Sequence, residues 1–234
     1  MNDPLKYPGD ELVLFQHAKK WKKYFSQQIK PFIKGSVLEV GAGIGATTLL
    51  LNDDTTEKWL LLEPDKEMAA ELKKKIQTKK LPANCQLQTG TIDNVISTFD
   101  TIIYIDVLEH IEKDAEEMKK AAAHLNPGGH VIILSPAFQY LYSPFDKAIG
   151  HHRRYTKKTI RNITPSELHL TSSRYYDSFG YFAALLNKLF LRQKYPTRQQ
   201  VLFWDNRMIP VSRITDNIFF HSFGKSIIAV WKKA

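Results

Sequence analysis

The chain has 234 residues, of which 43% are hydrophobic, so it can bury a substantial core and is most simply one elaborated domain. Its single cysteine, Cys85, excludes an intrachain disulfide and a thiolate-rich metal cluster, and no apolar run reaches the ~18 residues that span a bilayer. The net charge of +9 favours polyanions or an acidic membrane surface as partners, although the lysines lie in short, scattered groups that are typical of solvated helix faces.

The first predicted element is an amphipathic helix from Asp10 to about Lys30, where apolar residues recur at near-helical spacing and Pro31 marks the end. Five strands are then expected, with helix-compatible segments between them, notably 64–77 and 112–125. These strands are Val37–Val40, Trp59–Glu63, Gln86–Thr89, Thr101–Asp106 and His130–Ser135.

The boundaries of these elements carry recognisable signals. Asp65 is a suitable N-cap for the helix after the second strand, and Asn126–Gly129 predicts a helix stop and a tight turn before the fifth strand. The alternation of strand and helix predicts a doubly wound α/β fold. Because parallel strands end at one edge of a sheet, Glu39, Glu63, the residues after Thr89, Asp106 and Ser135 should gather around one crevice.

The pattern changes after Ser135. The segment 136–155 is too long for a simple connection and is rich in aromatic residues, which favours a functional lid. A short helix is expected at 157–163, a sixth strand at 173–178, an apolar helix at 179–191 and a closing strand at 225–231. We therefore expect one domain over 1–234, whose parts are a helical cover (1–35), a cofactor-binding core (36–135), a lid and substrate region (136–172) and C-terminal strands with a helical insertion (173–234).

The segment Val37–Gly45 contains the most informative motif: an apolar strand with an acid, a glycine turn and the start of a helix. Glycines at 41, 43 and 45 let the backbone turn tightly and approach a ligand, and the helix start offers unpaired N–H groups. Taken alone, the motif also fits a dinucleotide-binding turn, with Glu63 near the expected offset for a ribose-binding acid.

Four motifs together carry a resemblance to a known family. They are Leu38–Gly45, Leu62–Asp65, Asp106–Ile111 and Leu125–Gly129. Over 37–135 the chain resembles the class I S-adenosylmethionine-dependent methyltransferases, of small-molecule type and similar to methyltransferase types 11 and 12. The resemblance implies a Rossmann-like α/β fold with helices on both faces of a seven-stranded sheet, mostly parallel with an antiparallel C-terminal strand.

The resemblance also implies that S-adenosylmethionine is the cofactor. Glu39 resembles the acid that helps to hold the methionine end, and Glu63 the acid that accepts hydrogen bonds from the ribose hydroxyls. The other residues implied at the cofactor are Gly41, Ala42, Gly43, Gly45, Pro64, Thr91, Ile92, Asp106 and Val107. The family often has an acidic residue where Thr91 stands, so this chain departs from the pattern at the adenine.

A further element, Gly-His-His-Arg-Arg-Tyr-Thr at 150–156, resembles a group of small methyltransferases whose substrates are mostly unassigned, as does Phe223–Ser226. His151 and His152 are the first candidates for a general base, because imidazole titrates near neutral pH, and Asp106 is a third catalytic candidate. The residues expected at the acceptor are His110, Tyr142, Arg153, Arg154 and Tyr155. Alternatively, the arginines fasten the loop to the domain, and Glu109 and His110 have a structural role at a helix start. No metal is needed for the transfer and none is predicted.

The apolar helix at 179–191 is expected to be buried in the core or in a dimer, or else to meet a lipid-linked acceptor at a membrane surface. The sequence therefore predicts a cytoplasmic enzyme, monomeric or homodimeric, that methylates an oxygen, carbon or nitrogen of a small-molecule, lipid-linked or glycan-linked acceptor. The alternatives are an RNA methyltransferase, a nicotinamide-dependent oxidoreductase and a catalytically silent nucleotide-binding or partner-binding fold. Nucleic acid is the less favoured partner, because the Asn/Asp-Pro-Pro-aromatic element of base-amine enzymes is missing after the fourth strand.

Overall fold

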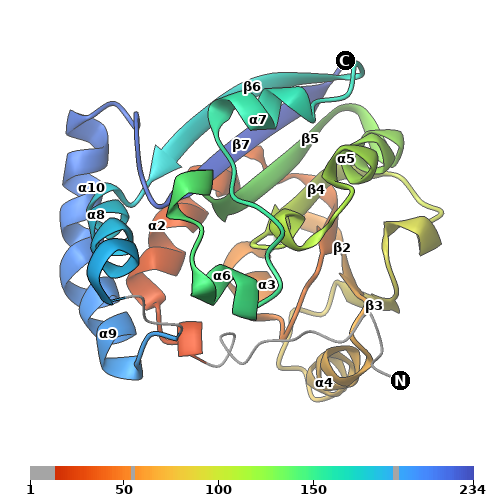
Figure 1. The fold of residues 1–234 in the computed structure, drawn as a ribbon. Helices are drawn as coiled ribbons and strands as arrows, with labels where there is room; N and C mark the ends of the chain where they lie inside the picture. Colours follow the sequence, from red (N-terminus) through yellow and green to blue (C-terminus); the bar gives the residue numbers. More distant parts are fainter. Residues whose placement is uncertain (1–13, 54–55, 192–194) are drawn as a thin grey trace.

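The computed structural model describes residues 14–53, 56–191 and 195–234. A seven-stranded sheet in the order β3-β2-β1-β4-β5-β7-β6 forms the centre of the molecule, with helices on both faces (Figure 1). The strands are β1 Gly35–Val40, β2 Thr56–Glu63, β3 Cys85–Thr89, β4 Phe99–Ile105, β5 Leu125–Pro136, β6 Leu168–Tyr176 and β7 Ser226–Lys233.

The first five strands pair in parallel, and β7 runs antiparallel between β5 and β6. The predicted fold class is confirmed. The α-helices are α2 Lys19–Ile29, α3 Ala46–Leu51, α4 Lys66–Gln77, α5 Asp114–Ala123, α6 Pro144–Ala148, α7 Lys157–Asn162, α8 Ser178–Leu186, α9 Arg198–Phe203 and α10 Ile209–Ile218. Short 3₁₀ turns are η1 Lys30–Phe32, η2 Ile92–Asn94, η3 Leu108–His110 and η4 Gln139–Leu141, and the π-helical segments are η5 Asn187–Leu191 and η6 Trp204–Met208. Among the described residues, no helix has both the length and the apolar character of a membrane span.

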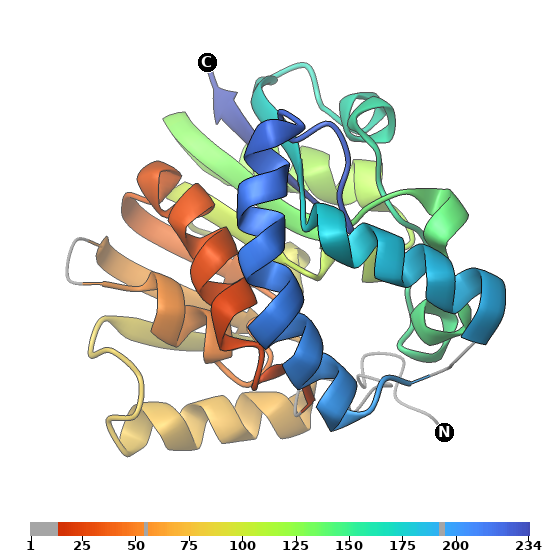
Figure 2. The same cartoon turned by 90° about the vertical axis from the view of Figure 1, so that its left-hand side faces the viewer.

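The central strands are buried on both faces, which explains why they appear in the sequence as continuous apolar runs. Val37 and Leu38 are both fully buried, and they belong to two different clusters on opposite sides of the sheet. One cluster packs against α5 and α7, and the other packs against α2, α9 and α10. Figure 2 shows α2 and α10 side by side on the second face.

The expected tight turn at Asn126–Gly129 lies inside β5, so this boundary was wrong. Phe99 of β4 pairs with Leu125, and Thr101, two residues later, pairs with His130. The extra residues on the β5 side form a bulge, where Gly128 takes a φ of +74°. The Pro-Gly-Gly segment therefore interrupts the pairing without ending the strand.

The helix expected from Asp10 is not continuous over the described residues, because the chain turns at 16–18 and α2 begins at Lys19. Asp205, far away in the sequence, caps the new helix. Its carboxylate accepts hydrogen bonds from the backbone N–H groups of Lys20 and Trp21 at 3.0 and 2.8 Å. A local reading of the sequence misses such a cap, because the capping residue lies 185 positions later. The part of the prediction before residue 14 lies outside the described residues.

The sixth strand begins at Leu168, five positions before the predicted start, because β7 pairs with it along its whole length. The larger correction concerns the apolar helix at 179–191. Core burial is wrong for its outer positions, which are exposed in the described chain. They are Phe182 (49%), Leu186 (55%), Leu189 (57%) and Phe190 (75%).

Candidate functional site

A cavity of about 1450 Å³ lies at the edge of the sheet where the parallel strands end. Gly41, Glu63, Thr91, Asp106 and Pro136 contribute to its wall, one from the end of each of the five parallel strands or the loop that follows. The predicted convergence of these strand ends on one crevice therefore appears in the structure. Glu39 and Ser135 lie behind the wall and are not among the lining residues.

The glycine turn after β1 gives the cavity a wall made of backbone. Gly41 and Gly43 have φ values of +68° and +56°, a region that residues with a Cβ rarely occupy. A Cβ on Gly41 would lie 2.6 Å from a methyl carbon of Val107, so no side chain fits there. The first strand thus ends in a turn that a ligand can approach closely.

Glu63, the last residue of β2, ties the glycine turn to the start of α4. Its Oε2 accepts a hydrogen bond from the Gly43 N–H at 2.7 Å, and its Oε1 accepts one from the Asp65 N–H at 2.9 Å. Asp65 in turn caps α4, as predicted, by accepting from the N–H groups of Glu67 and Met68. Burial raises the pKa of Glu63, while the two backbone hydrogen bonds oppose that rise. A carboxylate fixed in this way lines the cavity and keeps lone pairs for the hydroxyls of a ligand.

Within the described part of the chain, Glu39 has two neutral donors and no ion-pair partner. Its Oε2 accepts hydrogen bonds from the Thr48 hydroxyl at 2.8 Å and the Trp59 indole N–H at 2.7 Å. Burial raises the pKa of Glu39 to about 7, and these two hydrogen bonds limit the rise. Glu39 therefore links the end of β1 to α3 and β2.

This raised pKa predicts a pH-dependent stability. The folded protein holds a proton on Glu39 more tightly than the unfolded chain, whose carboxyl has the ordinary value of 4.5, so stability falls as pH rises from about 4.5 to about 7. We expect Glu39→Gln to abolish this loss of stability, which amounts to about 3 kcal/mol. Urea unfolding of both proteins at pH 4.5 and pH 8 measures this difference, and an equal effect of the variant at both values would show that Glu39 titrates normally.

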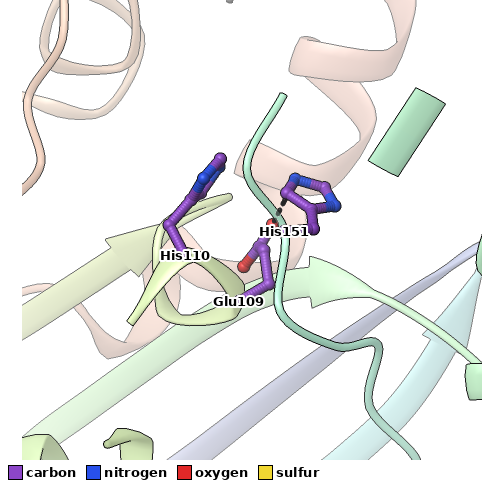
Figure 3. Close-up of side chains that lie close together, drawn as sticks. All are labelled: Glu109, His110 and His151. Atoms are coloured by element: carbon purple, nitrogen blue, oxygen red, sulfur yellow. Dashed lines mark ion pairs between the residues drawn. The ribbon is translucent and has the colours of Figure 1, made fainter. Parts of the chain in front are cut away.

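Three side chains meet on the floor of the cavity, and we call Glu109, His110 and His151 the Glu109 cluster (Figure 3). Their ligand atoms lie within 4.8 Å of one another, and Nε2 of His151 is 3.7 Å from Oε1 of Glu109. Burial raises the pKa of Glu109 well above its ordinary value, and burial together with the neighbouring His151 lowers the pKa of His110 to about 3. Two imidazoles and a carboxylate at this spacing could hold either a proton or a divalent cation.

Asp106 lines the same part of the cavity. It follows β4 with a φ of +54°, a sparsely populated conformation for a residue other than glycine, and its N–H donates to the Leu134 carbonyl. Burial raises the pKa of Asp106 to about 6, although the charges of His151 and Lys225 oppose this. Strained residues of this kind occur often at functional sites.

A buried ion pair in segment 136–155, the predicted lid, supports the cluster. Nε and a terminal nitrogen of Arg154 donate to the two oxygens of Asp146 at 2.9 and 2.8 Å. Nδ1 of His151 lies 2.9 Å from Oδ1 of Asp146, and the Ser143 hydroxyl and N–H both donate to Oδ2. Burial alone would raise the pKa of Asp146, but the hydrogen bond from His151 and the charge of Arg154 hold it well below its ordinary value. The ionised Asp146 therefore fixes the orientation of His151.

The far end of the cavity is largely apolar. It is lined by Gly180, Ala183 and Ala184 of α8 together with Phe203, Trp204 and Met208 of α9 and η6. Lys225 also lies there, with Nζ 4.1 Å from the centre of a Trp204 ring. Burial lowers the pKa of Lys225, while Asp177 opposes the shift.

Residues 38–131 match a family described as a methyltransferase domain. The match runs from β1 into β5, the part of the chain that forms the parallel strands of the sheet. No curated protein matches the sequence significantly.

The methyltransferase fold recurs in solved structures of low sequence identity. An S-adenosylmethionine-dependent methyltransferase from Clostridium acetobutylicum has a TM-score of 0.58 and 14% identity, covering 93% of this chain and 92% of that chain. Coclaurine N-methyltransferase, bound to N-methylheliamine and SAH, has a TM-score of 0.60 and 13% identity, with coverage of 92% and 72%. Magnesium protoporphyrin IX methyltransferase from Synechocystis, with bound SAM, has a TM-score of 0.56 and 13% identity, with coverage of 96% and 82%. These similarities establish the shared fold.

Most of the residues predicted to bind the cofactor lie on the cavity wall. They are Gly41, Ala42, Gly43, Glu63, Pro64, Thr91, Ile92, Asp106 and Val107. Glu39 and Gly45 are outside this lining set. Gly45 has a φ of +77° and directly precedes α3, so it shapes the turn. Thr91 caps η2 by a reciprocal pair of hydrogen bonds with Asn94.

The residues predicted at the acceptor divide into two groups. His110, His151, His152 and Arg154 line the cavity, whereas Tyr142, Arg153 and Tyr155 are outside the lining set. The Tyr155 hydroxyl donates to Asp114 at 2.9 Å and the Tyr142 hydroxyl donates to the His151 carbonyl at 2.7 Å. Arg153 pairs with Asp114 at 2.7 Å. These contacts agree with the alternative in which the segment fastens itself to the domain.

Sequence reasoning missed Asp146 altogether and gave Glu109 only a structural role. A local signal was present, because Ser143 and Asp146 form a capping box at the start of α6. That motif does not reveal the other partners of Asp146, His151 and Arg154, which are 5 and 8 positions later. The sequence did single out Phe223–Ser226, yet the position of Lys225 in the cavity wall became visible only in the fold.

Proposed function

We propose that the protein transfers a methyl group from S-adenosylmethionine to a hydroxyl group of an apolar, lipid-linked acceptor. The observation that carries this proposal is the continuity of the cavity. It joins the glycine turn and Glu63 at one end to the apolar wall of α8 at the other, with Asp106 and the Glu109 cluster between them. Its volume of about 1450 Å³ exceeds the roughly 300–1,000 Å³ of a typical small-ligand pocket, so a cofactor and an acceptor can both fit.

The residues at the glycine turn fit a nucleoside with an amino-acid tail. A backbone wall that admits no Cβ at Gly41 allows close approach of the ligand, and the Glu63 carboxylate suits a vicinal diol. S-adenosylmethionine, when bound, supplies a methyl group on a positively charged sulfur. The chain itself aligns the acceptor, keeps water out and receives the proton that a hydroxyl acceptor loses, in the region of Asp106 and the Glu109 cluster.

The outer face of α8 supports an apolar acceptor presented at a lipid surface. Phe182 of α8 and Phe219 after α10 both contact Phe223, with ring centres 5.7 and 5.1 Å apart, so their exposed side chains form one aromatic surface. Figure 2 shows α8 and α10 on the same side of the molecule. The inner face of α8 lines the cavity, so this helix lies between the cavity and a lipid surface that contacts its outer face.

The charges around this surface are mostly positive. Segment 178–226 contains only two acidic residues, Asp205 and Asp216, and both are buried. Its exposed basic residues among those that the structure describes are Arg198, Arg207 and Arg213. An apolar surface on a segment whose exposed charges are basic is suited to the headgroup region of an anionic membrane.

Incubation with S-adenosylmethionine labelled on the methyl group, with membrane lipids and aqueous metabolites supplied separately, tests the proposal. We expect label in the organic phase and no competition by bulk RNA. Label in the aqueous fraction would contradict the lipid-linked acceptor, although it would still support methyl transfer. Inhibition by RNA with a steep salt dependence would favour a nucleic-acid substrate.

Replacing Glu63 by Ala tests the cofactor side of the site. We expect the affinity for S-adenosylmethionine to fall by about 1.5–3 kcal/mol, the range for a hydrogen bond to a charged group. Titration calorimetry measures this loss, with Glu57→Ala on the exposed part of β2 as the matched control. If both variants bind as tightly as the parent protein, Glu63 has no role at the cofactor.

A further inference from the structure

The Glu109 cluster contains an unsatisfied buried oxygen. The side chain of Glu109 is fully buried, and its Oε2 accepts a hydrogen bond from the Ser135 hydroxyl at 2.8 Å. Among the residues that the structure describes, none donates a hydrogen bond to Oε1. A carboxylate oxygen left in this state is costly, so it calls for a cation or a donor that the described residues do not supply.

Two imidazoles face this oxygen (Figure 3). Nε2 of His151 lies 3.7 Å from Oε1 of Glu109, and the rings of His110 and His151 are 4.6 Å apart at an angle of 82°. Ligand atoms around a zinc ion, at bonds of about 2.1 Å, lie roughly 3.0–3.4 Å from one another. Side-chain movements of less than about 1 Å would therefore close the cluster around one ion.

Each member of the cluster is also held by a second partner. Nδ1 of His151 donates to Asp146, which Arg154 and Ser143 hold in turn. His110 makes a hydrogen bond to the backbone of Gly150, and Oε2 of Glu109 is bonded to Ser135. Metal-binding histidines nearly always donate their other ring N–H to a carboxylate or carbonyl, and ligating carboxylates are likewise hydrogen-bonded.

We propose that Glu109, His110 and His151 bind one divalent transition-metal ion, with Zn²⁺ as the best match. Two imidazoles with one carboxylate suit zinc, iron or nickel, whereas magnesium and calcium prefer oxygen ligands. Three protein ligands leave at least one position for water or an acceptor oxygen. The proposal concerns the acceptor side of the function proposed above, and metal binding can be measured whether or not methyl transfer is found.

The test is a metal titration of the full-length protein after removal of metal with a chelator. Zn²⁺ is titrated in competition with a chromophoric chelator, and Co²⁺ is added separately to record the absorption bands of a bound ion. We expect one equivalent of each metal, and weakening of zinc binding by about 100-fold or more in Glu109→Gln and His151→Gln. His152→Gln is the matched control, because His152 lies beside His151 but outside the cluster. It should bind zinc like the parent protein.

Thermal stabilisation by S-adenosylmethionine, recorded on the same samples, confirms that each variant is folded and separates the two proposals. Failure of the parent protein to bind zinc, or equal binding by the parent, Glu109→Gln and His151→Gln, would overturn the metal site. If S-adenosylmethionine still stabilised the protein, the proposed function would stand, and the cluster would hold a proton in place of a metal. Zinc binding without stabilisation by S-adenosylmethionine would support the metal site and contradict the proposed function.

Discussion

Replacing Asp146 by Ala is expected to destabilise the protein by about 3–5 kcal/mol, the range for breaking a buried ion pair. The Asp146 side chain is fully buried, and its two oxygens accept hydrogen bonds from Arg154, His151 and Ser143. Without the carboxylate, the guanidinium of Arg154 would remain in a site where it is only 8% exposed and has no anion beside it. Urea unfolding monitored by circular dichroism measures the loss.

A double variant separates the lost charge from a general disturbance of the lid. Asp146→Ala combined with Arg154→Met removes both charges, so it should recover a large part of the loss. The exposed pair of Asp93 and Lys120, 2.6 Å apart, provides the matched control, and Asp93→Ala should cost no more than about 1 kcal/mol. If Asp146→Ala lowered the free energy of unfolding no more than Asp93→Ala, the buried ion pair would not anchor the predicted lid.

The core of the fold could be predicted because its determinants are local. Each parallel strand is a short apolar run bounded by turn residues, and the glycine turn after β1 needs backbone conformations that glycine adopts easily. The position of the cavity at the ends of the parallel strands followed from topology alone, since parallel strands end at one edge. Glu63 and Asp106 were found in this way.

The parts that were not predicted depend on contacts between residues distant in sequence. Asp205 sets the start of α2 from 185 positions away, and the pairing of β6 with β7 sets the first residue of β6. The apolar stripe of α8 was expected to be buried in the core or in a dimer, because periodicity reports amphipathicity but not what covers the helix. In the fold, the small residues Gly180, Ala183 and Ala184 face the cavity and the large ones face outward.

The predicted lid shows that the role of a site residue, too, depends on contacts that the sequence pattern does not reveal. A pair of arginines in a loop is compatible with an anion clamp and with an internal brace, and the sequence pattern of 150–156 is identical in both cases. The difference lies in the partners. Arg154 has Asp146 and Arg153 has Asp114, two acids that no motif connects with the arginines. The role of an ionisable residue therefore follows from its neighbours more than from its motif.

Gly224→Ala is expected to be similarly damaging, because the new methyl group has no room. A Cβ at this position would lie 2.2, 2.5 and 2.6 Å from the backbone oxygen, carbon and nitrogen of Tyr176. Tyr176 cannot yield easily. The neighbouring N–H of Tyr175 donates to the His221 carbonyl, and the N–H of Asp177 donates to the buried Asp216. Forced overpacking against backbone should cost about 3 kcal/mol or more, which thermal unfolding can measure as a fall of roughly 6–12 °C in Tm.

Gly128→Ala is the matched control, because Gly128 has a φ of +74° but no atom within 4 Å of the place that a Cβ would take. It should lose only the conformational cost of a left-handed residue, about 1–2 kcal/mol. A loss in Gly224→Ala no larger than this would mean that β6 can move aside. Since Lys225 donates its N–H to the Asp177 carbonyl and lines the cavity, such movement would displace the cavity wall. In that case, the proposed acceptor side, where Lys225 and Trp204 lie, should be disturbed more than the proposed S-adenosylmethionine side.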